Sequence, residues 1–350
     1  MEINVETIRA GVASMLCVNL GVKAGESVLV VTDVATPEQW IKWPVLQLQD
    51  LSRRATLARL VAEIAAQELP ACTVGFLAYP ATGRSGSEPG EEVAARMQEA
   101  NVVVAVTTFS LSHTSAREAA CRAGARVASM PGFIPEMFYS GGPLLVDYYQ
   151  IAQDTARIAA CLTRTRVATV RSPAGTNLEF RLDGREGRVD DGLYLYPGAW
   201  GNLPGGEAYI APVEGTGEGV LVVEPGWHPG LVEPMRLVFS RGAVVAVEGG
   251  GEVGESLRAL LGVGSHQPTA RERARSLLAE LGVGTNPNAR RTDITLEAEK
   301  IKGTVHVAIG DNAHMGGINV ADYHADFVIP RATLLLDGKI VMDKGEWAFS

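Results

Sequence analysis

Residues 280–329 read ELGVGTNPNARRTDITLEAEKIKGTVHVAIGDNAHMGGINVADYHADFVI, and this stretch holds most of the side chains that could bind a metal. The segment from Tyr323 to Ile329 is typical of a β-strand, in which alternate side chains point to the same face. We therefore expect His324 and Asp326 to point the same way.

Residues 304–309 (TVHVAI) alternate in a similar manner. Val305, Val307 and Ile309 would occupy one face of a second strand, and His306 the other. A lone His on a strand is more often a hydrogen-bonded core or surface residue. Two strands with imidazoles, a nearby aspartate and several glutamates instead form a mixed nitrogen and oxygen set. Such a set suits Zn, Co, Mn or Fe(II), so the pattern predicts a metal site.

The composition is that of a globular chain. Its 350 residues, of which 46% are hydrophobic and 20% charged, suffice for two domains. The net charge of -9, without a cluster of Lys and Arg, argues against a nucleic-acid partner. We see no signal peptide, no apolar run near the length of about 18 residues that spans a membrane, and no C-x-x-C motif among the four cysteines. We expect a cytoplasmic protein without a membrane partner.

The first half alternates between strand-like and helix-like segments. Strands are expected at 26–33, 72–78, 101–107 and 126–129, and helices at 4–20, 55–69, 89–100, 114–123 and 145–163. This alternation predicts an α/β domain with an open parallel sheet.

Beyond residue 166 the sequence pattern changes to short runs of alternating apolar and polar residues, separated by Pro and Gly residues typical of turns. We expect an α/β parallel-sheet domain at 1–164, followed at 165–350 by a mainly antiparallel α+β domain that binds metal. Glu207 would begin a strand after a Pro-Gly turn. A helix is expected at 268–281, which would place Glu280 at a helix C-terminus, where a cation would offset the unfavourable dipole.

Five motifs in this half, taken in order, resemble the M29 family of metallo-aminopeptidases (the aminopeptidase T or leucyl aminopeptidase type). They are NLPGGEAY at 202–209 with Glu207, EGTGEGV at 214–220, LAELGVGTNP at 278–287 with Glu280, TVHVAIGDN at 304–312 with His306, and HADFVI at 324–329 with His324 and Asp326.

The resemblance implies a two-metal hydrolase that removes N-terminal residues from peptides with a metal-activated water. It also implies that one or two divalent metals (Zn, Co or Mn) are bound by Glu207, Glu280, His306, His324 and Asp326. Glu207 or Glu280 would serve as the catalytic proton shuttle. The expected substrate is a short peptide or another small molecule.

One position departs from that family. Its tyrosine ligand, seven residues after the match to His306, is replaced by Ala313, and His314 follows. Either His314 takes over as a metal ligand, or the second metal binds weakly or not at all.

Fe(II)-dependent dioxygenases that open dihydroxypyridine rings resemble the same frame and form the main alternative. A mononuclear iron could be held by His306, His324 and Asp326. In those enzymes a histidine stands at the position of Glu280 and an apolar residue at that of His306, so retention of both residues leads us to expect the aminopeptidase. A non-enzymatic module on this frame is the third possibility.

The apolar segment from Trp40 to Leu46 precedes a predicted helix. Together with the dimers of the related enzymes, it leads us to expect a homodimer, because a monomer rarely exposes such a surface.

Overall fold

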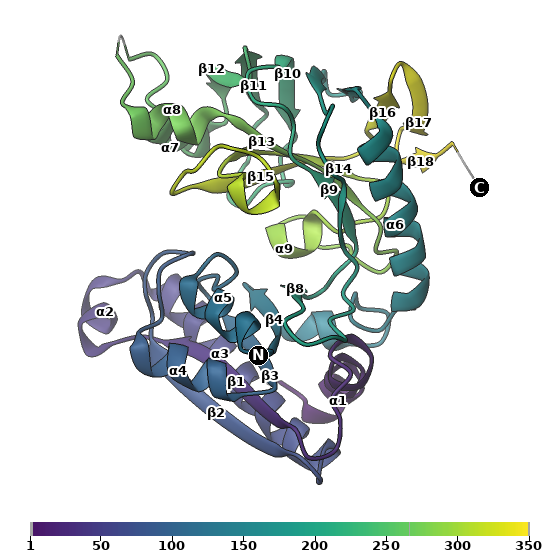
Figure 1. The fold of residues 1–350 in the computed structure, drawn as a ribbon. Coiled ribbons are helices and arrows are strands. Elements are labelled where there is room, and N and C mark those ends of the chain that lie inside the picture. The colour runs from purple at the N-terminus through teal and green to yellow at the C-terminus, as the bar shows by residue number, and fades with distance from the viewer. Residues whose placement is uncertain (1–2, 266, 349–350) are drawn as a thin grey trace. The chain divides into compact units, whose positions relative to one another are not determined.

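Residues 3–265 and 267–348 are described by a computed structural model in which the chain forms two units (Figure 1). The first unit comprises the chain up to Tyr148 together with Gly192–Gly205. The second comprises Tyr149–Asp191 and the chain from Gly206 onward. The predicted boundary at residue 164 falls at the end of helix α6 (Tyr148–Arg164), within the second unit. The segment 192–205 belongs to the first unit, where its strand β8 (Trp200–Asn202) pairs with β4 (Arg126–Pro131).

The first unit is built on a five-stranded parallel sheet with the order β2-β1-β3-β4-β8. Its strand β3 (Val102–Thr107) is buried at every residue, as expected for a parallel strand covered on both faces. The remaining elements are α1 (Val5–Ser14), a π-helix (Met15–Asn19), β1 (Ser27–Val34), α2 (Pro37–Lys42), α3 (Val45–Glu68), β2 (Thr73–Pro80), α4 (Glu91–Glu99), α5 (Ser115–Arg122) and a 3-10 helix (Pro135–Phe138). The predicted open parallel-sheet α/β architecture is confirmed.

The second unit contains two antiparallel sheets. The larger has the order β12-β11-β10-β6-β5-β16-β17-β18, and the smaller β15-β14-β13-β9-β7. The strands are β5 (Val167–Arg171), β6 (Asn177–Arg181), β7 (Arg188–Asp190), β9 (Glu207–Ile210), β10 (Glu218–Val223), β11 (Met235–Ser240), β12 (Ala243–Gly249), β13 (Leu278–Gly284), β14 (Val305–Gly310), β15 (His324–Ile329), β16 (Thr333–Leu336), β17 (Lys339–Asp343) and β18 (Glu346–Trp347). The helices are α6, α7 (Gly251–Leu261), α8 (Ala270–Ser276), α9 (Thr295–Ala298) and a 3-10 turn at Ala313–Met315. The mainly antiparallel second half is thus also confirmed.

The core of this unit joins apolar side chains from both sheets. Leu221 and Phe239 of the larger sheet belong to the same buried cluster as Leu281, Val307 and Phe327 of the smaller sheet. Because side chains alternate along a strand, the opposite face of the smaller sheet is left for polar residues. That face carries the candidate metal ligands.

The helix predicted at 268–281 is wrong in its second half. Helix α8 begins with a capping box between Thr269 and Glu272 and ends at Ser276, and Glu280 lies on the buried strand β13. Gly282 is likewise a strand residue, opposite His306. Helix α7 was not predicted. Among the described residues, no helix is both long and apolar enough to cross a membrane.

Candidate metal centre

Four neighbouring strands of the smaller sheet supply the predicted ligands. The register places Glu207 opposite Gly284 and Gly282 opposite His306. In the next row, Ala308 lies opposite both Glu280 and Asp326, and His324 follows opposite Gly310. The period of two predicted for His324 and Asp326 therefore brings them to one face, with side chains from β9, β13 and β14.

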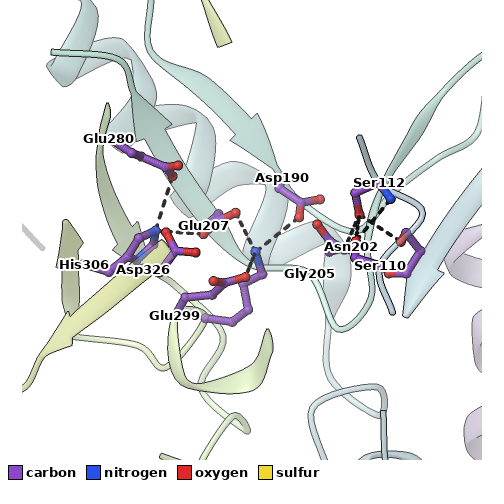
Figure 2. A network of polar contacts seen from close by, with 12 residues as sticks. Ser110, Ser112, Asp190, Asn202, Gly205, Glu207, Glu280, Glu299, His306 and Asp326 are labelled. Carbon is purple, nitrogen blue, oxygen red and sulfur yellow. Dashed lines mark hydrogen bonds and ion pairs between the residues drawn. The ribbon is translucent and has the colours of Figure 1, made fainter. Parts of the chain in front are cut away.

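Gly282 makes room for the His306 imidazole. A β-carbon at position 282 would lie 1.9 Å from His306 Nε2, a separation that no side chain could tolerate. The ring therefore extends across β13 and reaches carboxylates on both sides. Its Nε2 is 3.2 Å from Glu207 Oε2 and 3.3 Å from Glu280 Oε1 (Figure 2).

Glu280 lies between the two histidines. Its second oxygen, Oε2, is 3.3 Å from His324 Nε2, which is in turn 3.5 Å from Asp326 Oδ1. Among the described residues, two groups have ligand atoms within 4.8 Å of one another and could hold a metal, namely Glu207 with Glu280 and His306, and Glu280 with His324 and Asp326. The combination of His306, His324 and Asp326 considered for a mononuclear iron is not among these groups.

The charges within the cluster depend on one another. Although burial favours the neutral acid, hydrogen bonds from His306 and His324 lower the pKa of Glu280 to about 2. Burial also disfavours charged imidazoles, but Glu207 and Glu280 hold the pKa of His306 well above its usual value. Asp326 and Glu280 do the same for the pKa of His324. In the absence of a metal, protons on the two rings balance the carboxylates, and a cation that binds must displace them.

The donor set fits a divalent cation. His324 Nδ1 is 2.8 Å from the backbone oxygen of Asp311, which can only accept, so Nδ1 carries a hydrogen. In the neutral ring, Nε2 then presents a lone pair to the carboxylates of Glu280 and Asp326. Histidines that bind a metal through one ring nitrogen usually donate the other N–H to an acceptor such as a backbone carbonyl. The residues present therefore suit a metal once the Nε2 proton is displaced, and the hydrogen bond from Nδ1 to Asp311 can stay in place.

His314 is not brought into either group. Its Nδ1 is 2.7 Å from Asp311 Oδ2, and its ring stands edge to face beside that of His324, with centroids 5.9 Å apart. Burial lowers the pKa of His314, in contrast to the two histidines of the cluster.

Lys300 is a member of this region that the sequence did not reveal. Its side chain is completely buried, and Nζ contacts Glu207 at 2.5 Å, Glu299 at 3.0 Å and Asp190 at 3.4 Å. In the sequence, Glu299 and Lys300 look like a solvated charge pair, and no local signal distinguishes them from one.

The chain matches the family model described as NicX, 2,5-dihydroxypyridine 5,6-dioxygenase, over residues 15–348. A curated 2,5-dihydroxypyridine 5,6-dioxygenase from Pseudomonas putida is 26% identical over 310 residues, which cover 82% of this chain and 83% of that protein.

Two solved structures share the fold. A 2,5-dihydroxypyridine dioxygenase from Pseudomonas putida KT2440 aligns with a TM-score of 0.74 and 18% identity, covering 100% of this chain and 99% of the other. Wild-type AmpT from Thermus thermophilus aligns with a TM-score of 0.63 and 16% identity, covering 98% and 99%. At these identities the alignments establish the fold alone.

These matches correct the expected activity. The interpretation as a metallo-aminopeptidase, a hydrolase of the protease class, is wrong, because the family model and the curated relative are both dioxygenases. The resemblance to aminopeptidase T is confirmed for the fold, because the structure of AmpT aligns with this chain. Retention of Glu280 and His306 was therefore a poor guide to the family of the chain.

Proposed function

The chain belongs to the 2,5-dihydroxypyridine 5,6-dioxygenase family, and we propose that it cleaves the ring of a dihydroxylated pyridine with molecular oxygen. The observation that carries the proposal is the family match along nearly the whole chain. The proposed substrate is a small planar heteroaromatic molecule rather than a peptide.

We propose that Glu280, His324 and Asp326 would hold one Fe(II) ion, the metal of the dioxygenase alternative. Mixed imidazole and carboxylate sets with open positions are the usual ligands of non-haem Fe(II) in oxygenases. When bound, the iron would supply the site for activating molecular oxygen.

Accessibility supports this choice of ligands. The side chains of His324 and Asp326 are 18% and 16% exposed, whereas that of His306 is 1% exposed. A small substrate could therefore reach the group on β15, while His306 and Glu207 lie behind Glu280 and orient its carboxylate. One member differs from the usual two-histidine, one-carboxylate triad, because Glu280 supplies a second carboxylate in place of an imidazole.

The test is oxygen uptake by protein loaded with Fe(II) under anaerobic conditions. On exposure to oxygen and 2,5-dihydroxypyridine, we expect oxygen consumption and loss of the ring absorbance, and neither with Asp326→Ala. Protein with measured full iron occupancy that consumes no oxygen with this substrate would contradict the proposal.

We also propose a homodimer that uses the apolar segment near α2. Trp40, Ile41, Val45 and Leu46 are 56%, 86%, 69% and 76% exposed. Light scattering at micromolar concentration is expected to give twice the chain mass, and Ile41→Lys with Leu46→Lys to reduce it. A monomeric mass for the unmodified protein would overturn this proposal.

A further inference from the structure

We infer that Lys300 is a positioning residue for the proposed metal centre, holding Glu207 so that Glu207 and His306 brace Glu280. This inference rests on the proposed function because it concerns the same site. It assigns to Lys300 an effect on the metal that is transmitted through other side chains, without contact to the metal or substrate.

The two carboxylate oxygens of Glu207 have different partners. Oε1 accepts a hydrogen bond from Lys300 Nζ at 2.5 Å. Oε2 is buried and lies 3.2 Å from His306 Nε2, with which it forms an ion pair when the ring is protonated. A carboxylate is planar, so fixing Oε1 also fixes where Oε2 points. Lys300 therefore directs the second oxygen toward His306.

The next step runs from His306 to the proposed ligand. His306 Nε2 lies 3.3 Å from Glu280 Oε1, while the other oxygen of Glu280 faces His324. Glu280 is thus held by a chain of contacts that runs from Lys300 through Glu207 and His306. Ligands with fixed orientations bind metals more tightly, since less freedom is lost on binding.

The backbone sets the place of Lys300 independently of these carboxylates. Its carbonyl accepts from the Asn286 amide at 2.8 Å, and the Lys302 amide donates to the Asn286 carbonyl at 3.1 Å. Close approach to β13 requires a glycine at position 284, because a β-carbon there would lie 2.1 Å from the Ile301 oxygen. These backbone contacts therefore fix the position from which the Lys300 side chain extends.

A purely structural role would be neutralisation of buried negative charge. The ammonium also contacts Asp190 and Glu299, and burial of three carboxylates without it would be costly. The two roles differ in which partner matters for the metal. Positioning requires Glu207, whereas neutralisation would involve all three carboxylates.

The experiment measures binding of Co(II), a spectroscopic substitute for Fe(II), together with the absorption spectrum of the bound ion and the thermal midpoint. Lys300→Met is expected to weaken Co(II) binding by about 10–100-fold and to change the spectrum. The matched control is Lys302→Met, which removes a half-exposed ammonium paired with Asp154 at 3.3 Å and should leave both unchanged. Unchanged Co(II) affinity and spectrum in Lys300→Met would overturn the inference.

Glu207→Gln and the double variant separate the two roles. If Lys300 acts through Glu207, adding Lys300→Met to Glu207→Gln should cause no further loss of Co(II) affinity, and Glu299→Gln should cause little. Independent losses that multiply in the double variant would contradict positioning. If Lys300→Met does not fold, Glu207→Gln alone still decides, because wild-type affinity in that variant would exclude the proposed link.

The outcome is separable from that of the proposed function. Wild-type protein that binds metal but consumes no oxygen would remove the dioxygenase proposal and leave the role of Lys300 intact. Active wild-type protein whose metal affinity is insensitive to Lys300→Met would remove only the role of Lys300.

Discussion

The imidazole of His306 occupies the space in which a side chain at position 282 would lie. The two residues are paired across β13 and β14, and Nε2 of the ring would be 1.9 Å from a β-carbon at Gly282. The absence of a side chain on one strand thus permits a ring on the next to reach Glu207 and Glu280. A glycine contributes to this site as directly as a charged residue does.

Gly282→Ala is expected to displace the His306 ring and to weaken Co(II) binding at least tenfold. Overpacking in a rigid sheet should also lower the free energy of unfolding by about 1–3 kcal/mol. Competition with a chelator and chemical denaturation measure the two effects. Gly75→Ala on β2 is the control, because a β-carbon there meets its nearest atom at 3.4 Å. Equal metal affinities for both variants would contradict this account of Gly282.

Glu299→Gln should change the dependence of stability on pH. Burial, opposed by Lys300, raises the pKa of Glu299 from 4.5 to about 8. Between these values the folded state holds a proton that the unfolded state releases, so the contribution of this group is full below pH 4.5 and is lost as pH rises through 8. Relative to wild type, Glu299→Gln is expected to gain stability over this range. Denaturation series that stay parallel at all pH values would show that Glu299 titrates normally.

His314→Ala is expected to leave the number and affinity of bound metal ions unchanged. The ring is engaged by Asp311 and lies outside the groups able to hold a metal. Metal titration with equilibrium dialysis is the measurement. A loss of one equivalent per chain would restore the alternative in which His314 replaces the tyrosine ligand.

The sequence predicted those parts of the site that depend on local period. His324 and Asp326 share a face because strand side chains alternate, and the run at Val102–Thr107 indicates a strand buried on both faces. The assignment of β13 failed because Gly282, just after Glu280, is also typical of the residue that follows a helix. Only the partner strand reveals that Gly282 is needed for His306.

The burial of Lys300 could not be predicted, because it depends on contacts with residues far away in the sequence. Asp190 and Glu207 reach its ammonium from β7 and β9, more than ninety positions earlier. The identity of the reaction was also beyond local pattern, since the ligand types at Glu280 and His306 suit a hydrolase as well as an oxygenase. The family match over residues 15–348 supports the dioxygenase proposal.

The most direct test of the central claim is the origin of the oxygen atoms in the product. Fe(II)-loaded protein would react with 2,5-dihydroxypyridine under oxygen-18 gas in ordinary water, with immediate mass spectrometry of the product. A dioxygenase predicts that both atoms of one labelled oxygen molecule enter the ring-opened product. A product that carries oxygen from water alone, or an unchanged substrate at full iron occupancy, would contradict the proposed function.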